Sequence, residues 1–142
     1  HLANAGLIEG TYTGIAGSGN IQDIVRGENV PNGKISSTVF LTRYQADLSV
    51  SGGGYYAGSY GNLMFLGVDL STNIDGDNPT LLPEEMWNID TKLDDGRPAY
   101  GKIVSYNKSG RPNCASSDTS DVAEYELTNT TAGCTFIFKL GL

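Results

Sequence analysis

Short apolar segments separated by glycine-rich and polar stretches dominate the chain, a pattern typical of β-strands joined by tight turns. Two segments show it most clearly: residues 35–41 are rich in β-branched side chains, and residues 62–68 are almost continuously apolar. The last two apolar segments flank residues 128–133, a polar stretch that suits a hairpin connection. The strands predicted in this way are 35–41, 45–50, 62–68, 101–106, 123–127 and 134–140.

One helix is predicted at residues 83–93. Pro83 suits the first helical position, and the two acidic residues after it suit the positive end of the helix dipole. Gly96 can end the helix, and Trp87 lies beside its apolar face, so we expect that ring in the core. The apolar residues that recur at helical spacing and predict the buried face are Met86, Ile89 and Leu93.

The remaining stretches are predicted to lack regular structure, apart from the first residues. An apolar pattern over residues 2–8 indicates the end of a helix that stops at Gly10, with a disordered terminus as the alternative. Residues 11–33 predict a long loop, and residues 69–80 consist of turn-forming residues throughout. Since no repeat or linker interrupts the chain, residues 1–142 are expected to form one α+β domain with an antiparallel sheet.

The composition indicates a folded, glycine-rich domain with an acidic surface. Charged residues make up only 18% of the chain and hydrophobic ones 39%, and the 19 glycines favour many tight turns. The net charge of −7 argues against binding to a nucleic-acid backbone, which needs clustered lysine and arginine. We therefore expect no nucleic-acid partner, and the residues indicate no cofactor other than the calcium considered below.

The two cysteines, Cys114 and Cys134, are either buried free thiols or one disulfide, and we expect the disulfide. A metal site would need further cysteines or histidines, and a catalytic thiol would need a histidine base. The only histidine is His1, at the start of the chain. A stable disulfide implies an oxidising compartment, so we expect an exported protein. Because histidine-based catalysis would have to use His1, we expect that the protein is not an enzyme.

Several acidic residues stand in adjacent pairs, but adjacency alone does not predict an acid–base catalyst, which needs two carboxyl groups in different environments. Asp94 and Asp95 follow the predicted helix directly and are expected to accept hydrogen bonds from the local backbone.

A calcium loop is the sharper hypothesis for the acidic residues. The residues that would carry it are Asp69, Asn73, Asp75 and Asp77. Residues 73–76 match the middle of an EF-hand loop. The match fails at the first ligand position, which is Ser71, and at the twelfth, where Leu82 stands in place of glutamate. The alternative is a turn rich in aspartate and asparagine without an ion.

Residues 52–61 read GGGYYAGSYG and place Tyr55, Tyr56 and Tyr60 among small residues. Tyrosines on a glycine-rich loop can form a contact surface for a neighbouring subunit, a cell surface or a glycan. The alternative, which we favour, is a loop at the sheet edge whose tyrosines fold back onto the core.

The stretch that begins at Leu82 reads LPEEMWNIDTKLDDGRPAYGKI. Its N-I-D-x-K-x-D-D-G-x-P-x-x-G run, followed by a cysteine, a strand and a second cysteine, resembles bacterial type IV pilin-like proteins. These include the type II secretion pseudopilins and other proteins made with a prepilin leader. The opening LANAGLIEGTYTG is similar to the region in which the long pilin helix ends.

The resemblance implies a globular head that packs a long N-terminal helix against an antiparallel sheet, with a disulfide near its C-terminal end. It also implies an inner-membrane-anchored precursor facing the periplasm that polymerises, through that helix, into a cell-surface filament. The partners would be other pilin-like subunits and the inner-membrane assembly machinery. Some pseudopilins bind calcium in a loop. The alternative function is a secreted adhesin or carbohydrate-binding module that uses the loop at 52–61.

Overall fold

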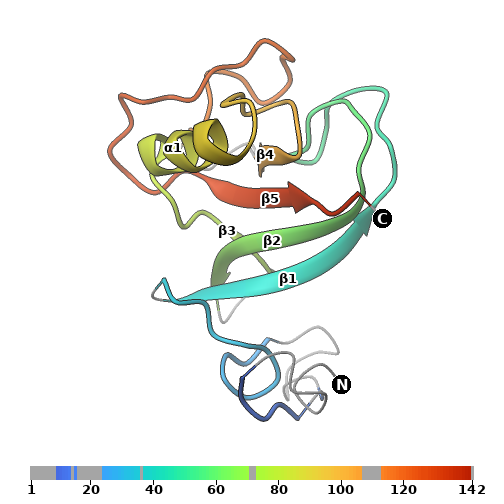
Figure 1. Ribbon diagram of the computed structural model, residues 1–142, viewed down its shortest axis with the longest axis vertical. Helices are drawn as coiled ribbons and strands as arrows, with labels where there is room; N and C mark the ends of the chain where they lie inside the picture. The colour runs from blue at the N-terminus through green and yellow to red at the C-terminus, as the bar shows by residue number, and fades with distance from the viewer. Residues whose placement is uncertain are drawn as a thin grey trace.

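The computed structural model describes residues 9–13, 15, 24–35, 37–70, 73–106 and 113–141, and for residues 69, 70 and 73–77 it describes the backbone alone. These residues form an antiparallel sheet with a short helix beside it, which confirms the predicted α+β class (Figure 1). The elements are β1 (Thr38–Gln45), β2 (Gly61–Leu70), β3 (Asn73–Asn78), α1 (Pro83–Leu93), β4 (Ile103–Tyr106) and β5 (Thr135–Lys139).

The strands lie in the order β1–β2–β5–β4, so β5 sits between two strands that precede it in the chain. Strand β2 pairs with β1 along one side and with β5 at Leu63 to Leu66. Strand β3 pairs with the end of β2, where Val68 lies opposite Asn78. Strand β2 is therefore the centre of the sheet, and its apolar residues supply side chains to both faces.

One face of the sheet forms a tyrosine-rich core. Leu63 and Phe65 point to this face, together with Ile137 of β5, and all three side chains are fully buried. The rings of Tyr55 and Tyr106 meet that of Phe65 edge-on, with centroids 6.2 and 5.8 Å away. The glycine-rich loop before β2 therefore covers this face with its own aromatic side chains.

Helix α1 covers part of the opposite face. In Figure 1 the helix and the loops that follow β4 gather on the β4–β5 side of the sheet, away from β1. Met86 is fully buried there against Ile103, with Phe136 and Phe138 of β5 alongside. Helix α1 does not cover the half of this face that β1 and β2 form.

The sequence located the helix correctly but not all of its buried face. Pro83 occupies the first turn, and the side chain of Glu85 accepts a hydrogen bond from the backbone N–H of Leu82 at 2.9 Å. Leu93, however, is 71% exposed and Trp87 is 38% exposed, so neither is the core residue that we expected. The fully buried position one turn after Met86 is Asp90 instead.

Strand β1 begins later than predicted. Thr38 donates to the carbonyl of Ile35 through both its backbone N–H and its hydroxyl, bonds that belong to a turn and not to a strand. Ser37 takes a φ of 64°, which a strand does not allow. The strand that the sequence placed at 35–41 therefore runs from Thr38 to Gln45.

Three further predictions are wrong. Residues 45–50 do not form a second strand: beyond Gln45, which ends β1, they form only an isolated bridge between Leu48 and Gly58, and the exposed Asp47 accepts the backbone N–H of Tyr60 at 3.0 Å. The turn predicted at 69–80 contains strand β3. Residues 123–127 form only an isolated bridge, between Ala115 and Tyr125, so they are not the hairpin partner of β5, which pairs with β2 and β4. The helix end expected over residues 2–8 lies outside the described residues.

Candidate functional site

The run of residues that follows α1 forms a turn leading from the helix to β4, and Asp94 holds that turn together. Its Oδ2 accepts hydrogen bonds from the backbone N–H groups of Lys102 and of Ile103, the latter at 2.9 Å. Gly101 lies against this carboxylate with a φ of +75°, and a Cβ at that position would clash with the same oxygen. Asp94 can therefore hold this turn only when position 101 is a glycine.

Neighbouring residues of the same turn use backbone bonds as well. Oδ1 of Asp95 accepts the backbone N–H of Arg97 at 2.9 Å, and Gly96 takes a φ of +73°. The carbonyl of Pro98 accepts the N–H of Ser105 in β4 at 2.9 Å. The expectation that Asp94 and Asp95 bond the local backbone is thus confirmed.

Asp90 links α1 to the segment that follows Cys114. Its side chain is 0% exposed, and its Oδ2 accepts the hydroxyl of Tyr125 at 2.7 Å. Burial raises the pKa of Asp90 from 3.8 to about 6, and the hydrogen bond from Tyr125 acts in the opposite direction. The analysis of helical spacing missed Asp90, although it follows Met86 by four positions and so had to share its face.

Three carboxylates converge at this end of the helix. One oxygen each of Asp90, Asp94 and Asp95 lies within 4.8 Å of the others, with Asp90 buried and Asp95 exposed. The sequence placed its calcium candidates elsewhere, at Asp69, Asn73, Asp75 and Asp77. The backbone of residues 73–78 is a strand, and those side chains lie outside the description. The acidic cluster that the structure describes is therefore a different one.

The predicted disulfide joins Cys114 to Cys134, with their Cα atoms 4.7 Å apart. Both residues are fully buried in the cluster that contains Met86 and Ile103. Cys134 directly precedes β5 and forms a bridge with Leu81, which lies two residues before Pro83, the first residue of α1. The bond therefore fastens the segment after Cys114 to the starts of both β5 and α1.

The tyrosines of the glycine-rich loop face inward. Tyr56 and Tyr60 are buried and Tyr55 is half-buried. The hydroxyl of Tyr60 donates to the carbonyl of Tyr56, and that of Tyr56 donates to the carbonyl of Ser117 at 2.8 Å. The structure agrees with the interpretation in which these rings fold back onto the core, and they do not form an exposed contact set.

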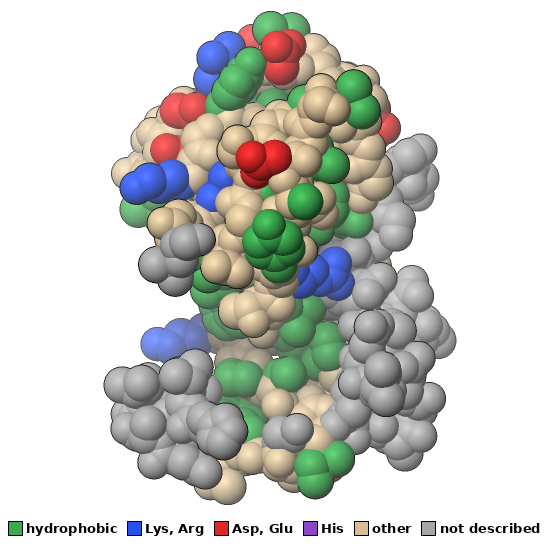
Figure 2. Space-filling model, turned by 90° about the vertical axis from the view of Figure 1, so that its right-hand side faces the viewer, with side chains coloured by type: hydrophobic (Ala, Val, Ile, Leu, Met, Phe, Trp, Pro, Cys, Tyr) green, Lys and Arg blue, Asp and Glu red, His purple; other side chains and the backbone are tan. Residues whose placement is uncertain are grey.

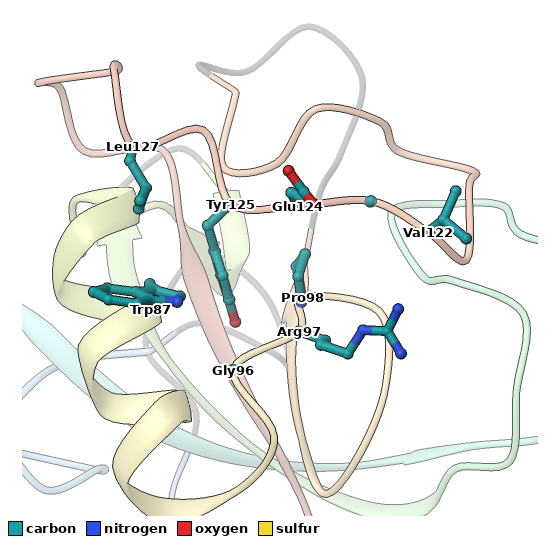
Figure 3. Close-up of a pocket in the computed structure, with 9 residues that line it drawn as sticks. Trp87, Gly96, Arg97, Pro98, Val122, Glu124, Tyr125 and Leu127 are labelled. Atoms are coloured by element: carbon teal, nitrogen blue, oxygen red, sulfur yellow. The ribbon is translucent and has the colours of Figure 1, made fainter.

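A shallow pocket lies between α1, the turn after it and the segment around Tyr125 (Figure 3). Its volume is about 370 Å³. The ring of Trp87 lies across from Tyr125 and Leu127, while Arg97 and Glu124 extend around Pro98 on the other side. Sequence reasoning missed this pocket, because it assigned Trp87 to the core.

Figure 2 shows one side of the molecule, on which acidic and basic side chains are scattered and the described residues form no basic stripe. Within the described part of the chain, no helix is long and apolar enough to cross a membrane. His1, the residue on which any histidine-based catalysis would depend, lies outside that part.

Replacing Asp94 with alanine should lower the free energy of unfolding by about 2 kcal/mol, because two backbone N–H groups lose a charged acceptor. Asp94→Asn keeps an acceptor oxygen in the same place and should lose less than half as much. Urea denaturation in buffer containing a chelator measures both variants. Equal losses in the two variants would contradict the hydrogen-bonding role.

The raised pKa of Asp90 predicts a pH dependence of stability. Between pH about 4 and 6 the folded chain holds a proton on Asp90 that the unfolded chain has released, so stability is fully present below pH 4 and falls as pH rises through 6. Because Asp94 is only half-buried and Asp95 is exposed, solvent screens their repulsion of Asp90, and we expect a fall of about 1–2 kcal/mol. In chelated buffer, the difference in unfolding free energy between the wild type and Asp90→Asn should follow this curve. A difference that does not change with pH would contradict it.

Comparison with known proteins adds no relative: no family model, no curated protein and no solved structure matches this chain.

Proposed function

We propose that this chain is the globular head of a type IV pilin-like subunit, a structural component of a bacterial pilus or of a short secretion pseudopilus. The observation that carries the proposal is an apolar half-face of the sheet that α1 leaves uncovered. We call it the open half-face, and its residues are Phe40, Tyr44, Met64 and Leu66.

The strand register places these four side chains on one side of the sheet. Phe40 lies directly opposite Leu66, Met64 lies opposite Thr42, and Tyr44 lies opposite Asn62, so all of them share one side of the sheet. Phe40 is 43% exposed and Tyr44 is 75% exposed, while Met64 and Leu66 are half-buried. Adjacent apolar side chains left in water on a sheet face are typical of a surface that another element covers.

A helix is the element that best fits this surface. Helix α1 already packs on the neighbouring part of the same face, against Phe136 and Phe138 of β5. A second helix along β1 and β2 would complete a layer of helices over the sheet, which is how an α+β domain buries an apolar sheet face. In the proposed subunit, this second helix is the C-terminal half of the long N-terminal helix, and its other half anchors the precursor in the inner membrane.

Two further features support the proposal. The disulfide requires an oxidising compartment, as expected for a head that faces the periplasm and then the cell exterior. The motif that resembles the pilin-like family also forms a single structural unit, in which α1, β4 and the disulfide-bonded segment are held by Asp90, Asp94 and Gly101. The partners are then other subunits of the same filament and the machinery that assembles them.

The deciding experiment is to isolate the protein from its own cells and to determine its mature N-terminal sequence and its assembly state. We expect a mature N-terminus produced by a prepilin peptidase, an apolar segment of about 20 residues, and recovery in the sheared filament fraction. A conventional signal peptide together with a monomer in the culture medium would contradict the proposal, and would favour a secreted binding module.

A matched pair of variants tests the open half-face in the full-length protein. Leu66→Lys places a charge where the helix would pack, so we expect filament recovery to fall at least tenfold. Val50→Lys places the same charge on a loop at a site that is 73% exposed, and recovery should stay at the wild-type level. Normal filaments from Leu66→Lys would show that no helix packs on this face.

A further inference from the structure

We propose that Asp90, Asp94 and Asp95 together bind one divalent cation, Ca²⁺ in preference to Mg²⁺, at the C-terminal end of α1. The helix supplies Asp90, and the turn after it supplies the other two, so three ligands come from six consecutive positions. This site is separate from the loop at residues 69–77 that the sequence suggested.

The spacing of the oxygens suits calcium. Calcium binds carboxylate and carbonyl oxygens at about 2.3–2.6 Å, so two ligands on opposite sides of one ion stand about 4.8 Å apart. One carboxylate oxygen of each aspartate lies within 4.8 Å of the others, which is close enough for the three to share a single ion. Magnesium gives up its hydration water reluctantly and usually binds through one or two carboxylates, so a set of three carboxylates favours calcium.

A second observation comes from Asp90 itself. Its side chain is fully buried, and Oδ1 has no hydrogen-bond partner, although Oδ2 is bonded to Tyr125. A buried carboxylate oxygen without a partner loses its hydration without compensation. A cation between the three aspartates would coordinate this oxygen and so supply the partner that the chain does not.

The position on the helix adds to the need for a cation. The C-terminal end of a helix carries partial negative charge, which disfavours anions there. Three carboxylates nevertheless lie at this end, and the basic residues near them are Lys92 in the last turn and Lys139 of β5, whose charge interacts with Asp94 and Asp95. Asp94 is half-buried and Asp95 is exposed, so an ion can reach the cluster from solvent and complete its coordination with water.

The chain supplies only three ligands, so water would fill the other coordination positions of the ion. We therefore expect weak binding, with a dissociation constant of about 10⁻⁴–10⁻³ M, as in extracellular calcium modules. Such a site would be filled outside the cell or in the periplasm when calcium is at millimolar levels. The bound ion would fix the end of α1 to the turn before β4 and, through Asp90 and Tyr125, to the disulfide-bonded segment.

Calorimetric titration of the chelator-treated chain with CaCl₂ tests the proposal. We expect one saturable Ca²⁺ per chain, and a rise in melting temperature of about 4–10 °C at 10 mM Ca²⁺. MgCl₂ should give less than half of that rise. Asp95→Asn keeps the oxygen that accepts the N–H of Arg97 but removes the charge, so its affinity for Ca²⁺ should fall at least tenfold.

Two control variants locate the site. Asp118→Asn removes an exposed carboxylate outside the cluster and should titrate like the wild type. Asp75→Asn removes a carboxylate of the calcium set that the sequence suggested and should also leave binding intact. Absence of saturable binding, equal affinity in Asp95→Asn and the wild type, or loss of binding in Asp75→Asn would each overturn the assignment.

Discussion

Replacing Phe65 with alanine should lower the free energy of unfolding by about 3–5 kcal/mol, the largest effect that we expect from a single core substitution. Phe65 is fully buried at the centre of β2, where the rings of Tyr55 and Tyr106 meet it edge-on and the guanidinium of Arg43 lies 5.1 Å from its centroid. Truncation removes the ring that all three contact. Phe65 itself belongs to a strand that is paired on both sides, so its backbone cannot move to close the space.

Phe40→Ala is the matched control, because it removes the same side chain from the same sheet. Phe40 lies outside the buried core and is 43% exposed, so we expect a loss below about 1 kcal/mol. Chemical denaturation followed by the single tryptophan, Trp87, measures both variants. Equal losses would mean that the open half-face is already covered. In the full-length subunit that we propose, Phe40→Ala should lower the free energy of unfolding by more than it does in this chain.

Replacing both cysteines with alanine should lower the free energy of unfolding by about 3 kcal/mol. The cross-link spans a sequence separation of 20, and closing a loop of that size restricts the unfolded chain by about this amount in the chain-entropy model. Alanine suits the test because both positions are buried among apolar residues, where serine would add an unpaired hydroxyl. Denaturation of the wild type with and without reductant gives the matching comparison.

Reduced wild type and the double variant should lose similar stability, and the loss should disappear when the wild type is reoxidised. Mass analysis without reductant should find no free thiol in the native chain, since both cysteines are bonded. Two free thiols per molecule, or a double variant as stable as the oxidised wild type, would contradict the prediction.

The helix, the disulfide and strands β2, β4 and β5 could be predicted because local residues specify them. Pro83 and the acidic residues after it mark a helix start, and continuous apolar runs mark buried strands. Strand β3 could not be predicted, because its residues NIDGDN have turn-forming character and only pairing with β2 makes them extended. The position of β5 in the sheet also depends on long-range pairing that no local pattern encodes.

The candidate site was predicted in part. The bonds of Asp94 and Asp95 to the local backbone follow from their place after a helix, so the sequence was sufficient to infer them. Asp90 and Tyr125 are 35 positions apart, and their contact exists only once the disulfide-bonded segment lies over α1. Trp87 was misplaced for the same reason: a helix pattern shows which side is apolar but not how far neighbouring segments reach around it.

The place of β5 in the sheet has a consequence for how the domain forms. Strands β2 and β4 lie on either side of β5, and β5 follows both of them in the chain. During synthesis or export, neither strand can find this neighbour until residues 135–139 emerge, so the sheet remains in two parts until then. Cys134 immediately precedes β5, so its bond to Cys114 forms beside the strand that closes the sheet. Oxidation and sheet closure should therefore be coupled, and a chain stalled before residue 135 would expose two strand edges to aggregation.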